Sequence, residues 1–310
     1  MSSFNGWPAP AEGPDRDFVG YGRHVPKVTW PGGARVAVSL CLNYEEGSER
    51  SYHAGDNVNE NGGESPRVFT PGHRNLAMES IFEYGSRTGV QRLLRMFDDL
   101  GVKCTALAAA VALKVNREAA EWMVESGHEI CSHGWRWSEQ WTMSREEERE
   151  RIGWAIELFE EVCGQRPSGW YSRYGPSIHT RELLVEAGFL YDSDAYNDDL
   201  PYFTPVKGKQ HLVVPYSMVY NDGRYFSGQF GGPDDFFSLA KRAFDYHWDE
   251  GATHPRMMSI GLHPRWVGQA GRASALKEFI EHALGRGKVW FARRDEIAKW
   301  WLDHHAEFPR

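Results

Sequence analysis

The chain has 310 residues, 41% of them hydrophobic, and a formal net charge of −8 at pH 7. Its length and apolar content are sufficient for one large buried core. The negative charge, with no block of basic residues, argues against nucleic acid or an anionic membrane as a partner. The sequence shows neither an apolar run of transmembrane length nor a signal-peptide core, so we expect a cytoplasmic protein whose four cysteines are reduced core thiols.

The N-terminal segment, residues 1–33, is rich in glycine and proline, which predicts an irregular arm packed on the rest of the chain. Its aromatic residues Phe18, Tyr21 and Trp30 are expected to tether it. Residues 34–310 are expected to form a single domain.

This domain opens with residues 34–47, ARVAVSLCLNYEEG. The apolar run 36–42, rich in β-branched residues, is typical of a buried strand in a parallel sheet, and it leads into Glu45 and Glu46. Carboxylates at the C-terminal end of such a strand lie where α/β barrels place their chemistry. The polar, glycine-rich loop 48–74 that follows is long enough to predict a lid or a subunit contact.

Strands and amphipathic helices then alternate to the end of the chain. An i, i+3, i+4, i+7 apolar stripe from Val90 ends at Gly101, and Ser144 with Glu147 forms a capping box. This alternation predicts an α/β fold of parallel βα units closed into an irregular barrel of about seven parallel strands. The predicted strands are residues 36–42, 102–107, 129–132, 169–172, 189–191, 212–214, 256–262 and 288–291, and the predicted helices lie near 89–101, 117–126, 144–164, 180–187, 234–250, 273–284 and 295–305.

Polar side chains follow the C-terminal ends of several predicted strands. Because these ends meet at one face of a barrel, we expect the side chains to converge there as a base, an acid and an orienting cation, the general form of a hydrolytic site. Each alone has a structural interpretation, such as a core histidine, a helix cap or a rim ion pair. The residues are Glu45, Glu46, His133, Arg173, Asp192, Asp194 and His263.

These segments resemble the motifs of the polysaccharide deacetylase (NodB-homology) superfamily, whose fold is an irregular (β/α) barrel. The TFDDG motif of that family matches residues 43–47, NYEEG, and its SHTxxH motif matches residues 132–137, SHGWRW. The arginine, aspartate and terminal histidine motifs match residues 171–176, 191–194 and 259–264, in that order.

Within the superfamily, residues from about 16 to 305 are more similar to the cytoplasmic, metal-independent allantoinases of the PuuE type. The stretches that carry this resemblance are LNYEEGSER (42–50), MESIFEYGSRTGVQRLL (78–94), GHEICSHGWRW (127–137), FLYDSDAYNDDLPY (189–202), SIGLHPR (259–265) and VWFARRDEIA (289–298). The resemblance also implies a homo-oligomer such as a tetramer.

The departures from the deacetylase motifs bear on the metal. In the deacetylases the second aspartate and two histidines bind a divalent ion, whereas this chain has Glu46, His133 and Trp137 at those positions. A catalytic zinc ion needs three protein ligands, and only two are offered, so we expect no metal and no other cofactor. Without a Lewis acid, an unactivated sugar acetamide is a poor substrate. A ring ureide or imide is a better one, because its departing nitrogen is conjugated to a second carbonyl.

The resemblance therefore implies a hydrolase that opens allantoin to allantoate in purine catabolism. In this interpretation Glu45 is the general base, Arg173 holds Glu45 or binds a substrate oxygen, and His263 protonates the ring nitrogen. The resemblance also assigns Asp192 to the catalytic residues. It assigns Glu46, His133, Trp137, Asp194 and Arg87 to substrate binding. Arg87 is included because the 85–87 segment lies at a helix entrance, directly after the predicted lid.

Three alternatives remain open from the sequence. The first is the same chemistry on another ring, such as a cyclic imide. The second is deacetylation of a polysaccharide or peptidoglycan unit. The third is a non-catalytic ureide-binding protein, against which the intact Glu45 and His263 argue.

Overall fold

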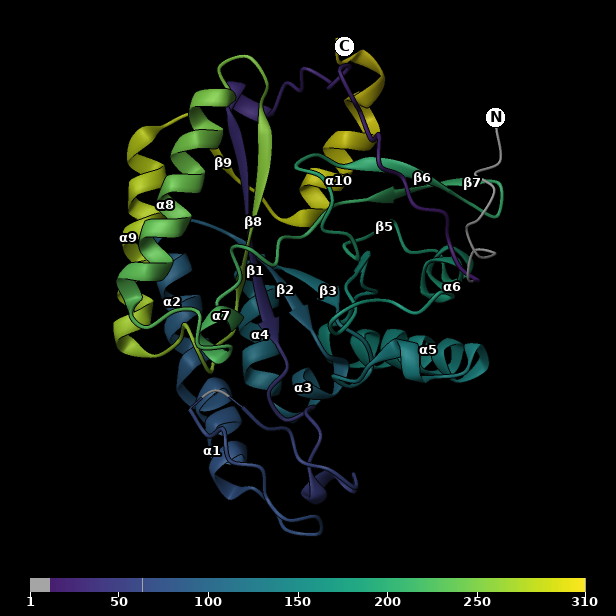
Figure 1. Ribbon diagram of the computed structural model, residues 1–310, viewed down its shortest axis with the longest axis vertical. Coiled ribbons are helices and arrows are strands. Elements are labelled where there is room, and N and C mark those ends of the chain that lie inside the picture. The colour runs from purple at the N-terminus through teal and green to yellow at the C-terminus, as the bar shows by residue number, and fades with distance from the viewer. Residues whose placement is uncertain (1–11, 63, 310) are drawn as a thin grey trace, which may run out of the picture.

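The computed structural model describes residues 12–62 and 64–309 (Figure 1), and its centre is one curled sheet. The strands run in the order β6-β7-β5-β4-β3-β2-β1-β8, with β9 beside the first half of β1. All described pairings are parallel except β6 with β7. The strands are β1 (Val36–Tyr44), β2 (Cys104–Ala108), β3 (Glu129–Ser132), β4 (Gly169–Trp170), β5 (Tyr191–Asp192), β6 (Tyr202–Val206), β7 (Lys209–Val213), β8 (Arg256–Leu262) and β9 (Val289–Phe291).

This arrangement confirms an α/β fold with a mostly parallel, curled sheet, although the curl forms a half-barrel with two ends, β6 and β8. The strand β6 was not predicted. It forms a hairpin with β7 through Lys207 and Gly208, whose φ angles of 49° and 77° are those of a type I′ turn.

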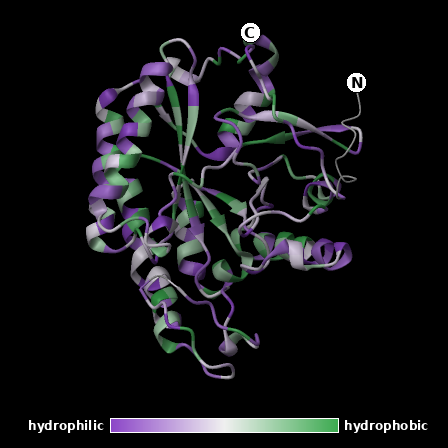
Figure 2. Cartoon of the chain, in the orientation of Figure 1, coloured by the Kyte–Doolittle hydropathy of each residue, from purple (hydrophilic) through white to green (hydrophobic). Residues whose placement is uncertain are grey.

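The helices cover the outside of the sheet, with α8, α9 and α2 on one side and α5 and α6 on the other (Figure 1). Figure 2 shows hydrophobic residues along the central strands and more hydrophilic residues on the outer helical surfaces. The helices are α1 (Leu76–Tyr84), α2 (Val90–Leu100), α3 (Ala110–Val115), α4 (Arg117–Glu125), α5 (Arg145–Cys163), α6 (Thr180–Ala187), α7 (Gly223–Phe226), α8 (Pro233–Glu250), α9 (Ala270–Arg286) and α10 (Arg294–His304).

The predicted ends of the helices near residues 101, 164 and 187 are confirmed. Gly101, Gly164 and Gly188 end α2, α5 and α6 in the left-handed conformation. Ser144 caps α5 by accepting the Glu147 N–H.

The open side of the half-barrel is bridged by a buried arginine. The guanidinium of Arg294 donates to the carbonyl groups of Val214 and Pro215, just after β7, and to Ser259 Oγ on β8. Asn221 forms a further bridge with Gly261 of β8. The gap between β7 and β8 is thus closed by polar contacts rather than by a strand ladder.

Residues 27–30 of the N-terminal arm lie against the last helix and the residues that follow it. Trp30 is buried in a cluster with Trp301 of α10, and Lys27 N–H donates to the Pro309 carbonyl. Phe18, which was expected to act as a tether, is instead 79% exposed. Residues 1–11 of the predicted arm lie outside the described residues. In the described part of the chain, no helix combines the length and apolarity needed to cross a membrane.

Candidate active site

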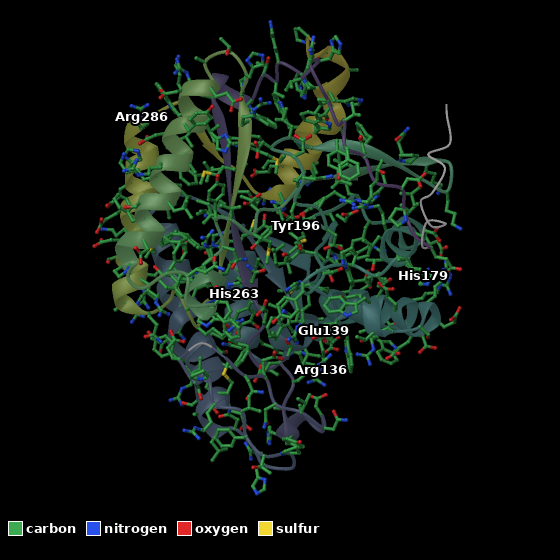
Figure 3. The ribbon with its side chains drawn as sticks, in the orientation of Figure 1. Arg136, Glu139, His179, Tyr196, His263 and Arg286 are labelled. Carbon is green, nitrogen blue, oxygen red and sulfur yellow. The ribbon has the colours of Figure 1, made fainter. Side chains whose placement is uncertain are left out.

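The site lies at the C-terminal ends of β1, β3 and β8, where a cavity of about 330 Å³ opens. We call it the site cavity. Glu45, His133, Trp137 and His263, four of the residues selected from the sequence, line it together. His263 is labelled near the centre of Figure 3. The remaining lining combines aromatic and methionine side chains with several polar groups, which is typical of a small-molecule site.

Glu45 is the buried centre of the cluster. Its Oε2 accepts from Arg265 Nη2 at 2.6 Å, while Oε1 lies 3.3 Å from His133 Nε2 and 3.6 Å from His263 Nε2. Burial favours the neutral acid, but the Arg265 and His263 charges outweigh it and hold the pKa of Glu45 well below its usual range. The side chain is therefore a carboxylate at neutral pH.

His263 is oriented by Asp222, a residue in the segment between β7 and α7. His263 Nδ1 donates to Asp222 Oδ1 at 2.5 Å, and the other Asp222 oxygen accepts the backbone N–H groups of His263 and Val267. This fixes Nε2 as the ring atom that faces Glu45. Burial disfavours the charged ring, but the Asp222 and Glu45 carboxylates raise the pKa of His263 to about 9. The ring is a cation at neutral pH and can donate a proton.

Arg265 joins the two adjacent glutamates. Its Nη1 donates to Glu46 Oε1 at 3.2 Å, and its Nη2 donates to Glu45. Glu46 is fully buried behind Glu45 and also accepts the Glu45 backbone N–H, rather than lying in the cavity as a substrate contact. Burial and the neighbouring Glu45 charge raise the pKa of Glu46 above its usual value, although Arg265 opposes them. Glu46 thus contacts Arg265 and is not on the described lining of the cavity, and its expected contact with water or substrate stays a prediction.

The expectation that Arg173 holds Glu45 is corrected. Arg173 Nη2 donates to Glu60 at 2.6 Å and Nη1 donates to the Trp137 carbonyl at 2.8 Å, while its guanidinium lies 3.7 Å from the centre of the Trp137 ring. The cation that holds the Glu45 carboxylate is Arg265. Arg173 instead connects loop 48–74 to the rim of the barrel.

Asp192 and Asp194 are not among the described residues that line the cavity. Asp192 is buried and paired with Arg181 and His211, and the catalytic role expected for it stays a prediction. Asp194 accepts from the backbone N–H and the hydroxyl of Ser172, at 2.7 Å each, so it fixes the backbone after β4 rather than a substrate. Burial and the Asp192 charge raise the pKa of Asp194 to about 7.

Arg87 is exposed and is likewise outside the described lining residues. It lies in a π-helical turn, Gly85–Gly89, that joins α1 to α2. The part of this turn that approaches the site is its glycine backbone, because a Cβ at Gly85 would lie 2.5 Å from Glu46 Oε1 and 2.9 Å from the backbone nitrogen of Arg265. The structure thus does not place Arg87 on the described lining of the cavity, and its role in substrate binding stays a prediction.

The close approach of Gly85 leads to a prediction about stability. Alanine there adds a methyl group against Glu46 and Arg265, so we expect Gly85→Ala to cost about 1–3 kcal/mol of unfolding free energy and to lower kcat. Gly153→Ala is the matched control, because a Cβ there meets no described atom within 4 Å. It should stabilise α5 by about 0.5–1 kcal/mol, the ordinary preference for alanine in a helix. Urea unfolding measures both, and a stabilised Gly85→Ala would contradict the packing described here.

The three positions that correspond to the metal ligands of the deacetylases do not fit a catalytic metal ion. The Trp137 indole offers no lone pair to a metal, and Glu46 is already bound by Arg265. His133 donates from Nδ1 to the Tyr171 carbonyl at 2.6 Å, and its Nε2 faces Glu45. Among the described residues no group of three His, Cys, Asp or Glu side chains could hold an ion. The position between the carboxylates is occupied by the Arg265 guanidinium.

The fold and this site define a hydrolase of the deacetylase class, and comparison with known proteins agrees. A family model described as polysaccharide deacetylase matches residues 77–190. A protein of Schizosaccharomyces pombe, named as a polysaccharide deacetylase, is 35% identical over 94% of this chain and 98% of its own length. The chain therefore belongs to the polysaccharide deacetylase family.

Two solved structures resemble the whole chain at 46% identity, covering 94% of this chain and 98% of theirs, with a TM-score of 0.89. One is described as a polysaccharide deacetylase from Pseudomonas aeruginosa PAO1, and the other is PuuE allantoinase.

Sequence reasoning missed Arg265 and Asp222. Arg265 follows His263 by two residues, in the stretch 259–265, and no role was predicted for it. Its contacts with Glu45 and Glu46 join residues 220 and 219 positions apart, which no local pattern shows. Asp222 belongs to Asn221-Asp222-Gly223, a sequence typical of any turn.

Proposed function

We propose that this protein opens a cyclic amide ring by hydrolysis, with allantoin to allantoate as its leading reaction. The observation that carries the proposal is the environment of Glu45, a carboxylate held between cationic His263 and Arg265 in a mostly apolar cavity. The likeness to PuuE allantoinase supports the choice of substrate.

The reaction uses Glu45 and His263 as a base and an acid. Glu45 takes a proton from a water molecule whose oxygen attacks the ring carbonyl. His263 Nε2 gives a proton to the departing ring nitrogen as the carbon–nitrogen bond breaks, and the product carries a carboxyl group and a free amide nitrogen. The contact of 3.6 Å between Glu45 Oε1 and His263 Nε2 provides the route by which the proton returns to the histidine.

A fixed cation replaces part of what a metal ion supplies in this family. Arg265 is fully charged, buried and held by two carboxylates, so it needs no reorganisation when negative charge develops on a carbonyl oxygen. Its Nε and the indole Nε1 of Trp266 are buried donors without hydrogen-bond partners among the described residues, and both side chains line the cavity. These donors suit a substrate that carries carbonyl oxygens.

The proposal is tested by a turnover panel of allantoin, hydantoin, succinimide and chitin oligomers, run with and without a chelator. We expect ring opening of a cyclic compound, fastest for allantoin, at a rate that chelation leaves unchanged. Hydrolysis of chitin oligomers alone would favour the second candidate, an N-deacetylase, which the names of the relatives suggest. Activity abolished by the chelator, with about one zinc ion per chain, would overturn the metal-independent mechanism. The homo-oligomeric state and the cytoplasmic location stay predictions.

The raised pKa of His263 predicts the pH dependence. The acid form is needed to protonate the leaving group, so kcat should fall as pH rises through about 9. The folded pKa exceeds the ordinary value of 6.5, so the same group contributes stability that is complete below pH 6.5 and is lost as pH rises through about 9.

Asp222→Asn distinguishes this interpretation from a general loss of folding at high pH. Removing the Asp222 charge lowers the pKa of His263, so the basic limb of the kcat profile should move to lower pH by a unit or more. A pH–rate profile whose basic limb stays in place in this variant would remove His263 from the acid role.

A further inference from the structure

We propose that Glu60, in loop 48–74, is a specificity residue that accepts a hydrogen bond from a substrate N–H group. This inference rests on the proposed function and deepens it, because it states which chemical feature of the ring the site recognises. Glu60 lines the site cavity together with Glu45 and His263, although it comes from a different part of the chain.

The two oxygens of the Glu60 carboxylate have different surroundings. Oε1 accepts from Arg173 Nη2 at 2.6 Å. Oε2 is buried and has no hydrogen-bond partner among the described residues. A buried carboxylate oxygen without a partner costs folding free energy, and such atoms in native proteins call for an explanation. A bound ligand with an N–H group would supply the missing donor.

Contacts within the protein hold Glu60 in a fixed position. Its backbone N–H donates to the Arg50 carbonyl at 2.8 Å. Its partner Arg173 is fixed by the Trp137 carbonyl and lies over the Trp137 and Tyr174 rings, at 3.7 and 4.8 Å from their centres. The carboxylate therefore cannot rotate freely, and Oε2 keeps its direction.

The cavity offers hydrogen-bonding groups that complement a substrate ring edge on which N–H and C=O groups alternate. Glu60 Oε2 is an acceptor without a partner, whereas Trp266 Nε1 and Arg265 Nε are donors without partners in the described chain. Ring ureides and imides carry an N–H beside or between carbonyl groups, which matches one acceptor and nearby donors. A ring whose nitrogens are alkylated lacks the donor that Glu60 needs, and a methyl group in its place meets a desolvated carboxylate.

Glu60→Gln is the sharpest variant, because it keeps the shape of the side chain and reverses its hydrogen bonding at the cavity. Arg173 only donates, so the glutamine oxygen must face Arg173 and the NH2 group must face the cavity. The NH2 group of the glutamine then faces the N–H group of the substrate, and two donors cannot form a hydrogen bond with each other. Glu139→Gln is the matched control. It removes a carboxylate whose Oε1 lies 3.6 Å from Arg173 Nε but which is outside the described lining of the cavity. Glu139 is labelled below His263 in Figure 3.

The probes are hydantoin, 1-methylhydantoin and 3-methylhydantoin, with binding to the full chain measured by calorimetry. Loss of a charge-assisted hydrogen bond weakens binding by roughly ten- to a hundredfold, so wild type should bind hydantoin that much more tightly than one of the methylated rings. Glu60→Gln should lose that preference and raise KM for hydantoin or allantoin by a similar factor, with a smaller change in kcat. Glu139→Gln should behave as wild type.

Three outcomes overturn the proposal: equal binding of all three rings by wild type, an unchanged preference in Glu60→Gln, or no binding of hydantoin at all. Turnover is read separately. If wild type binds hydantoin with the expected preference but hydrolyses no ring, the proposed reaction fails while the assignment of Glu60 stands.

Discussion

Replacing Glu45 with glutamine is expected to lower kcat by about 10²- to 10⁴-fold, the usual contribution of a general base. Glutamine has nearly the same shape but cannot take the proton of the attacking water. It also loses the charge that supports the cationic form of His263, 3.6 Å away. Steady-state kinetics on whichever ring is turned over measures the effect, with thermal unfolding to establish that the variant is folded.

Glu46→Gln is the control for this prediction. Glu46 contacts Arg265 and a backbone N–H, so its loss should cost about 1–3 kcal/mol of contact energy and a much smaller share of kcat. Both variants need a pH series, because adjacent carboxylates titrate as a coupled pair. Equal losses in the two variants across pH would mean that the base is misassigned.

Arg265→Met is expected to have a large effect on both stability and activity. The guanidinium is fully buried between Glu45 and Glu46, and its removal leaves Glu46 without a cation and Glu45 with His263 alone. Breaking a buried ion pair in this way costs about 3–5 kcal/mol. The pKa of Glu45 should rise as well, so the carboxylate form and with it kcat are lost at neutral pH. Arg265→Lys keeps the charge but not the two-pronged geometry, so it should recover part of the stability and less of the activity.

Arg181→Met separates the two effects. Arg181 pairs with buried Asp192 away from the described lining of the site cavity, and Asp192 keeps His211 as a second partner. We expect this variant to lose stability and to retain kcat. Urea unfolding measures the stability of both variants, and steady-state kinetics measures their kcat. A wild-type kcat in Arg265→Met would show that the Arg265 cation has a structural role only.

The strands and most helices could be predicted because their signals are local. An apolar run such as residues 36–42 needs only its neighbours in sequence to be read as a strand, and a glycine at 101, 164 or 188 ends a helix through its own backbone freedom. The strand β6 was missed because Pro205 argues against a strand and Lys-Gly is not a common hairpin turn.

The site was only partly predictable for the opposite reason. Glu45, His133 and His263 each follow a strand end, and the topology of a parallel sheet brings such ends together. Which cation reaches Glu45 depends on side-chain length and on the packing of distant segments. Both Arg173 and Arg265 were possible by sequence position, and the structure places Arg265 there. Likewise, Gly85 matters because its missing side chain leaves room for Glu46 and the Arg265 backbone, a property that no sequence pattern displays.

The hairpin of β6 and β7 also limits how copies of this chain could assemble. Across a two-residue turn, Val206 and Lys209 form a hydrogen-bonded pair, so the next pair, Pro205 with Gln210, is a non-bonded one and the Pro205 nitrogen faces away from β7. The free side of β6 therefore lacks a donor where a further strand would need one. At the other end of the sheet, Gly261 of β8 already forms a β-bridge with Asn221. Joining two sheets edge to edge is disfavoured at both ends, and an oligomer of this protein would have to associate through its helices and loops.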